Sequence, residues 1–167
     1  MFGKTSVATL ILTIGMGGTA LAQTPAKLDQ FDYWGAYSYK ANNNTVCYVL
    51  STPTAQAPST VSHGDNFFLV SKRTGGVVTF EPQFMAGYNL RDGSQVTVSV
   101  GDKNFSLFTR GSSAWVDTAQ GEANLVAAMK AGSTMTVKAV SGRGTNTSYT
   151  YSLKGISSAL NAVQKCK

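Results

Sequence analysis

Short runs of alternating apolar and polar residues recur about every ten residues along most of the chain. The clearest run is QVTVSV at 95–100, in which every second residue is valine and the residues between them are polar. A period of two is typical of a strand with one buried face and one face in water. The pattern predicts strands at 33–40, 45–51, 66–72, 77–81, 95–100, 105–110, 114–116, 135–141 and 148–154.

Turn signals separate these runs. Glycine pairs and Asp-Gly or Gly-Asp steps supply the positive backbone φ angles that tight reversals require. They occur at 75–76, 92–93, 101–102 and 142–144. The segment VTVSVGDKNFSLF has alternating residues on both sides of Gly101 and Asp102, which predicts a β-hairpin at this point.

Two segments have the period of a helix. The segment 121–131 carries its apolar residues along one side, with Asp117-Thr118 as a cap before it and Gly132 as a stop after it. The segment at about 156–165 also has apolar residues at helical spacing. We therefore expect a mainly β fold, a single-domain β-sandwich or partly open barrel, with two short helices at about 121–131 and 156–165.

The first 22 residues have the organisation of a signal peptide. Lys4 precedes an apolar run at 5–18, and the small residues of Ala-Leu-Ala end at Ala22, directly before Gln23. An uncleaved membrane anchor is the alternative, but the run is shorter than the ~20 apolar residues that a membrane span needs. We expect cleavage between Ala22 and Gln23.

The mature chain is then an exported protein with no further transmembrane segment. We expect a flexible leader at 23–30 and one β domain at 31–167. The expected location is the periplasm, with attachment to the outer membrane or secretion as alternatives.

Export bears on the two cysteines, Cys47 and Cys166. In an oxidising compartment two distant cysteines most often pair, whereas metal sites need three or four clustered ligands. Cys166 continues the apolar side of the C-terminal helix, which would present it to the strand that contains Cys47. We predict a disulfide between them and no metal; two buried free thiols are the alternative.

The chain has a formal charge of +6, and removal of Lys4 with the signal peptide leaves +5. Because only 13% of the residues are charged and the basic ones are scattered, we expect weak attraction to anionic surfaces and no nucleic-acid binding. Basic residues that border turns are candidates for an anion-attracting rim, although we favour ordinary solvated turn positions for them. They are Lys72, Arg73, Arg91, Arg110 and Arg143.

His63 is the one histidine, and it lies between Ser62 and Asp65. Members of a Ser-His-Asp triad meet across a fold, which near neighbours on one loop seldom do. Its position directly before a Gly-Asp turn predicts an exposed loop histidine. The chain contains no G-x-S-x-G, H-E-x-x-H or Walker lysine motif. We predict no catalytic residue and no cofactor; a small envelope hydrolase that uses His63 and a carboxylate is the alternative.

The segment DYWGAYSYK contains three tyrosines at alternating spacing, Tyr33, Tyr37 and Tyr39. On one face of a strand they would form a strip able to stack on a sugar or on a partner protein. Packing in the core explains the same pattern, and we favour it for Tyr37 and Tyr39.

Several segments occur in an order and spacing typical of one family. They are FDYWGAYSY, TVCYVLSTP, DNFFLVS, AGYNLRDGSQVTVSVGDKNFSLFTRGSSAW, LVAAMKAGSTMTVKAVSGRGT and TYSLKGISSALNAVQKC. Together they resemble the invasion-associated locus B family of alphaproteobacteria over roughly residues 31–166. The resemblance implies an exported periplasmic or envelope protein with a compact β-rich fold and no established catalytic activity. It also implies that Cys47 and Cys166 are the family's cysteines.

These observations predict a non-catalytic cell-envelope protein that binds another protein or an anionic envelope polymer, with a link to host interaction. A structural or stress-related envelope factor is a further alternative. The pattern of residues says nothing about the oligomeric state.

Overall fold

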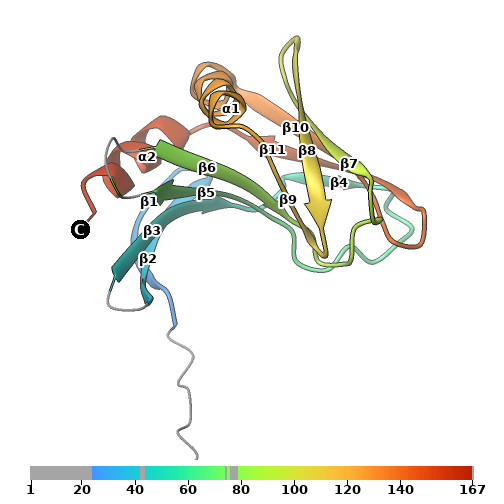
Figure 1. Cartoon of the computed structure of the whole chain (residues 1–167), viewed down its shortest axis with the longest axis horizontal. Coiled ribbons are helices and arrows are strands. Elements are labelled where there is room, and N and C mark those ends of the chain that lie inside the picture. The colour runs from blue at the N-terminus through green and yellow to red at the C-terminus, as the bar shows by residue number, and fades with distance from the viewer. Residues whose placement is uncertain (1–23, 42–43, 74, 76–78, 167) are drawn as a thin grey trace, which may run out of the picture.

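A computed structural model of the chain describes residues 24–41, 44–73, 75 and 79–166. The predicted signal peptide at 1–22 and its cleavage point, Ala22 and Gln23, lie outside the described residues. The described residues form a strongly bent sheet with both helices on the same side of it (Figure 1).

Eleven strands and two helices make up the described part of the chain. The strands are β1 (Ala26–Phe31), β2 (Trp34–Ala41), β3 (Asn44–Ser51), β4 (Ala55–Ala57), β5 (Phe67–Arg73), β6 (Thr79–Met85), β7 (Gln95–Val100), β8 (Lys103–Arg110), β9 (Ser113–Trp115), β10 (Thr134–Val140) and β11 (Asn146–Ser152). The helices are α1 (Ala119–Ala131) and α2 (Ile156–Gln164).

The strands form one antiparallel sheet in the order β1-β2-β3-β5-β6-β9-β8-β7-β10-β11-β4. Because β1 and β4 stand at its two edges, the sheet does not close into a barrel. The predicted mainly β fold with two short helices is confirmed, and the unclosed sheet is consistent with the predicted β-sandwich or partly open barrel. Neither helix among the described residues is long and apolar enough to cross a membrane.

Local signals in the sequence place most elements correctly. The predicted hairpin is present, with β7 and β8 paired from Gln95 and Phe108 to Val100 and Lys103, and with Gly101 at a φ of 59° in the turn. Helix α1 begins two residues before the predicted start. Its cap is Thr118, the second residue of the predicted Asp117-Thr118 pair, and the helix ends at Gly132.

The flexible leader predicted at 23–30 is wrong from residue 26 onward. Residues Ala26–Phe31 form β1, which pairs with β2 at the edge of the sheet. Five of its six residues are exposed, so the strand has no apolar alternation that the sequence could reveal. Backbone hydrogen bonds to β2 hold it, and they depend little on side-chain type.

The core lies between the helices and the inner face of the sheet. Trp34, Phe68 and Leu125 are completely buried there, and α2 packs on β2 and β3 while α1 packs on β6. The indole nitrogen of Trp34 donates to the carbonyl oxygen of Ser152, 2.9 Å away, so the buried ring also keeps its hydrogen bond.

The predicted disulfide joins Cys47 on β3 to Cys166 just beyond α2, with a Cα–Cα distance of 6.3 Å. The buried residues of α2 lie on the side that continues to Cys166, as its helical phase predicts. At the start of the helix Gly155 has a φ of 96°, and a Cβ there would collide with the carbonyl oxygen of Phe31. The start and the end of α2 are therefore both fixed against the first three strands.

Candidate functional site

The face of the sheet turned away from the helices carries a row of large side chains. In the strand register Leu50 lies opposite Leu69, Leu69 opposite Gln83, Gln83 opposite Trp115, and Trp115 opposite Phe108. Directly paired residues project from the same face of a sheet. The row therefore crosses β3, β5, β6, β9 and β8, and its last member, Phe108, is 42% exposed.

A tyrosine cluster continues this face onto β2. The rings of Tyr37 and Tyr48 stack with centroids 5.5 Å apart, and the ring of Tyr39 meets Tyr48 edge-on at 6.1 Å. The ring of Tyr37 lies over Gly35, where a Cβ would be only 2.5 Å from it. Burial raises the pKa of Tyr48, with Tyr37 and Tyr39 as smaller causes, so its hydroxyl stays uncharged.

The predicted core position of Tyr37 and Tyr39 is wrong. Trp34 and Ala36 face inward on β2 and are completely buried, so the alternate residues face outward. Tyr39 is 37% exposed and Tyr37 is half-buried. Tyr33 lies in the turn before β2, where it is 51% exposed. The strip in the sequence is therefore a surface feature of the molecule.

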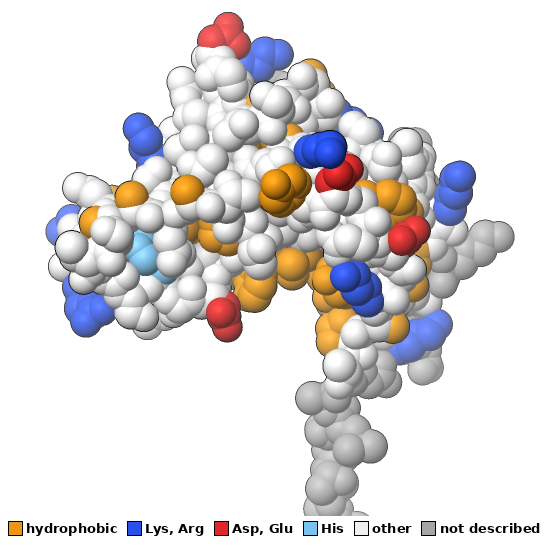
Figure 2. Space-filling model, turned by 180° about the vertical axis from the view of Figure 1, so that it is seen from behind, with side chains coloured by type: hydrophobic (Ala, Val, Ile, Leu, Met, Phe, Trp, Pro, Cys, Tyr) orange, Lys and Arg blue, Asp and Glu red, His pale blue; other side chains and the backbone are white. Residues whose placement is uncertain are grey.

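We call this surface the outer aromatic face. It consists of Tyr37, Tyr39, Tyr48, Leu50, Phe67, Leu69, Met85, Phe108 and Trp115. Figure 2 shows hydrophobic side chains gathered along the hollowed underside of the molecule. The charges beside it are Glu81, which forms an ion pair with Arg73, and Arg110.

The five predicted basic candidates do not share one surface. The ammonium group of Lys72 donates to the carbonyl oxygen of Cys166, 2.6 Å away. Arg73 forms ion pairs with Glu81 and Glu122. Other basic candidates are exposed and lie in separate places, with Arg110 beside the outer aromatic face, and Arg143 and Arg91 near the other end of the sheet.

Glu122 explains why Arg73 is held in place. This carboxylate in the first turn of α1 is buried, and its oxygen lies 3.0 Å from the guanidinium of Arg73. Burial raises the pKa of Glu122, and the opposing effect of Arg73 is smaller. Arg73 therefore stabilises a buried charge and is a poor candidate for a binding residue.

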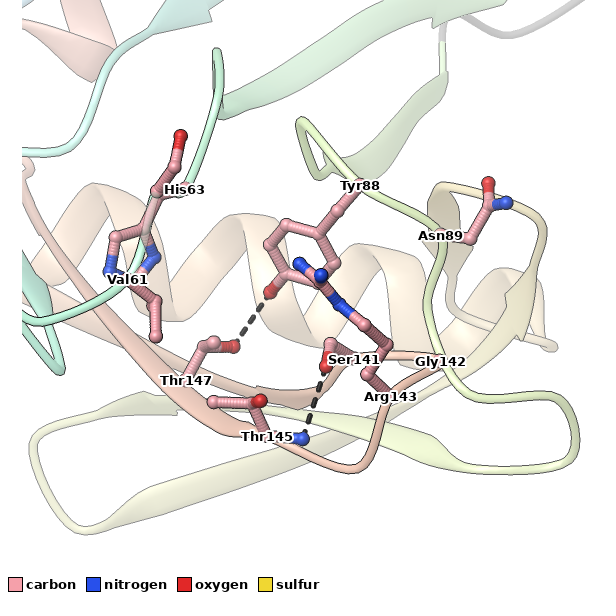
Figure 3. Close-up of a pocket in the computed structure, with 10 residues that line it drawn as sticks. Val61, His63, Tyr88, Asn89, Ser141, Gly142, Arg143, Thr145 and Thr147 are labelled. Atoms are coloured by element: carbon pink, nitrogen blue, oxygen red, sulfur yellow. Dashed lines mark hydrogen bonds between the residues drawn. The ribbon is translucent and has the colours of Figure 1, made fainter.

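A second candidate site is a pocket of about 650 Å³ at the far end of the sheet. Three loop segments form it, 61–63, 88–89 and 141–147, and Figure 3 shows their side chains around the opening. Its volume lies in the range of small-molecule sites. We call it the three-loop pocket.

His63 lines this pocket and corrects a prediction from the sequence. It is only 4% exposed, not an exposed loop residue. Its Nδ1 lies 2.9 Å from the hydroxyl of Tyr149, and its Nε2 lies 2.9 Å from the carbonyl oxygen of Pro58. Tyr149 is 86 positions away in the chain, so no local spacing could reveal it.

The contacts of His63 do not resemble a catalytic site. Both ring nitrogens are engaged, and among the described residues neither contacts a serine hydroxyl or a carboxylate. A general base needs a free nitrogen within reach of the proton that it removes. The described residues also contain no group of three or more side chains placed to hold a metal ion.

We expect His63→Ala to lower the free energy of unfolding by about 2 to 3 kcal/mol, because it leaves the carbonyl of Pro58 without its histidine partner and removes one of the two hydrogen bonds of the buried Tyr149 hydroxyl. Urea unfolding measures this effect. The control is Ser62→Ala, an exposed neighbour that should change stability by less than about 0.5 kcal/mol. Equal stability of the two variants would contradict the buried position.

Comparison with known proteins agrees with this architecture. The family model described as Invasion associated locus B (IalB) protein matches residues 34–164, nearly all of the described chain. The chain belongs to the IalB family. This IalB chain is also similar to the crystal structure of invasion associated protein B from Bartonella henselae, with a TM-score of 0.58 and 14% identity. The match covers 81% of this chain and 93% of the Bartonella chain.

At that identity the Bartonella structure shows a shared fold alone. No curated protein matches the IalB chain. The binding surface must therefore be inferred from the residues of this chain.

Proposed function

We propose that this IalB chain is an exported, non-catalytic cell-envelope protein that binds a protein partner through its outer aromatic face. The observation that carries the proposal is the composition of that face. Tyrosine, tryptophan, phenylalanine and methionine are enriched in the centres of protein–protein interfaces, where charged residues are depleted. The outer aromatic face has these residues, and two of the charges that border it, Glu81 and Arg73, form an ion pair with each other.

Export is supported by two independent features. Residues 1–22 have the pattern of a signal peptide, and the domain contains a disulfide of the kind that persists in oxidising compartments. We place the protein in the periplasm, where it would meet membrane-attached proteins. The Bartonella protein is named as invasion associated. For this chain, we propose that contact with a host is made through the protein partner that it binds.

Site-specific cross-linking tests the proposal. A photoreactive amino acid at position 69, in the middle of the outer aromatic face, should give a discrete cross-linked protein in intact envelopes of the source bacterium. The matched control places the same group at Lys138, an exposed residue on β10. Equal products from both positions, or none from position 69, would contradict the proposal. A product that glycosidases but not proteases remove would identify a polymer instead.

The hydrolase alternative lacks a supporting contact. It would need a histidine nitrogen within reach of a serine or a carboxylate, and both nitrogens of His63 have other partners.

A further inference from the structure

The wall of the three-loop pocket contains a continuous chain of hydrogen bonds between two backbone carbonyls. It runs from Pro58 through the ring of His63 to the hydroxyls of Tyr149 and Tyr88. From Tyr88 it continues to Thr147 at 2.6 Å, drawn as a dashed line in Figure 3, and ends at the carbonyl of Ala139 at 3.2 Å.

The chain lacks one proton when His63 is neutral. Five contacts join four side chains to two carbonyls that can only accept. A neutral imidazole and three hydroxyls bring four protons, one for each side chain. Burial raises the pKa of Tyr149, so its phenol does not give up its proton. All five contacts are satisfied only when both nitrogens of His63 carry a proton, which makes the ring a cation.

The neutral form leaves one contact unsatisfied. Four protons cannot fill five contacts, so two acceptors face each other at one of them. Protonation of His63 supplies the missing proton and adds a positive charge beside the pocket. This charge is buried, so it is stabilised by an anion that occupies the pocket.

Within the described part of the chain, the groups that face His63 include no anion that could do this. Tyr149 comes from β11, Tyr88 from the loop after β6, and Arg143 from the β10–β11 hairpin. Asp65, on the loop of His63 itself, is exposed and does not line the pocket. The pocket therefore combines a cationic arginine with a histidine that gains a hydrogen bond when it is charged.

The loops around the pocket are held together before any ligand binds. The side chain of Asn66 is buried and donates to the carbonyls of His63 and Gly64, and it accepts from the amide of Gly87. A Cβ at Gly87 would lie 2.6 Å from the carbonyl oxygen of His63. The loops that contain these two residues can therefore pack this closely only because position 87 is glycine. A preorganised pocket loses little entropy when it binds a ligand.

We propose that the three-loop pocket is a binding site for an acidic sugar, and that it binds more tightly when His63 is protonated. The guanidinium of Arg143 suits the carboxylate, because arginine recognises carboxylates with paired donors. Ser141, Thr145 and Asn89 line the same pocket and offer hydroxyl and amide groups to the sugar hydroxyls. The ring of Tyr88 supplies an apolar surface beside them.

Calorimetry of the mature protein with glucuronate tests this site, with glucose and inorganic phosphate as comparison ligands. We expect glucuronate to bind, to bind more tightly at about pH 5.5 than at about pH 7.5, and to take up protons on binding. Glucose and phosphate should each bind at least about tenfold more weakly. Equal binding of phosphate would reduce the pocket to a general anion site and overturn the proposal, as would binding without proton uptake.

Two arginine variants locate the binding. Arg143→Gln should weaken glucuronate binding at least about tenfold, because it removes a charge-assisted hydrogen bond. Arg91→Gln, an exposed arginine near the same loops that does not line the pocket, should bind as the unchanged protein does. Equal effects of the two variants would show attraction to net charge alone and would overturn the proposal.

The ring signals of His63 give a second readout that needs no variant. The chain has one histidine, so its NMR signals are unambiguous once any tag is removed. At a fixed pH, glucuronate should move these signals toward those of the doubly protonated ring, and signals that do not move in this direction would overturn the coupling. Retention on envelopes through the outer aromatic face is independent of this pocket, so Arg143→Gln should leave it unchanged.

Discussion

Replacing Cys166 with serine is expected to lower the free energy of unfolding by about 2 to 5 kcal/mol. The disulfide joins residues 119 positions apart, so its loss frees a long segment of the unfolded chain. It also releases the end of α2 from β3, although the buried side of the helix still packs on the sheet. Urea unfolding of the oxidised protein and the variant measures the difference.

Cys47→Ala and the double variant provide the control for this prediction. Each single variant and the double variant should have nearly the same stability, because all three lack the same bond. Ser157→Ala, an exposed position on α2, should change the free energy by less than about 0.5 kcal/mol. Two cysteines that react with an alkylating reagent in the native protein without reductant would contradict the account.

The second large effect concerns the outer aromatic face. Removing Tyr39 and Phe108 together is expected to weaken envelope binding at least about thirtyfold, since interface hot spots contribute about 2 kcal/mol or more. These are the most exposed members of the face, and they lie toward its opposite ends. Alanine at both positions should therefore remove contacts with the partner and cost little folding stability.

Tyr33→Ala is the matched control for that pair. Tyr33 is more exposed than either residue, but it lies in the turn before β2 and is not part of the outer aromatic face. Its variant should bind envelopes normally. A loss of binding with Tyr33→Ala, or none with the Tyr39 and Phe108 pair, would place the binding surface elsewhere. Unfolding midpoints of all variants exclude misfolding as a cause.

Alternation and turn residues were enough to predict most strands. The hairpin at Gly101 and the cap at Thr118 follow from residues next to one another in the chain, and the phase of Cys166 follows from a single helix. Strand β4 was not predicted because its three exposed residues show no apolar alternation. The exposed edge strand β1 was not predicted for the same reason.

The candidate sites depend on contacts between distant segments. Alternation showed that Tyr37 and Tyr39 share a face, but only the pairing of β2 with its neighbours decides which face is buried. The burial of His63 does not follow from the sequence, because the partner that satisfies its ring nitrogen, Tyr149, comes from the distant strand β11. Arg73 borders a turn in the sequence, but only the fold brings it beside the buried carboxylate of Glu122.

The structure also changes the balance between two modes of binding. The sequence favoured a basic surface, whereas the described structure separates the basic candidates and exposes the aromatic residues. Binding through the outer aromatic face rests on apolar burial, which salt does not screen. Binding through scattered charges weakens as the Debye length falls from ~10 Å at 0.1 M salt to ~3 Å at 1 M.

Retention of the mature protein on isolated envelopes across that salt range is the most direct test of the proposed function. We predict a bound fraction that stays constant from about 0.1 M to about 1 M salt. The same experiment with the Tyr39 and Phe108 double variant should show little retention at any salt concentration. A bound fraction of the unchanged protein that falls steeply with salt, together with normal retention of the double variant, would contradict binding through the outer aromatic face.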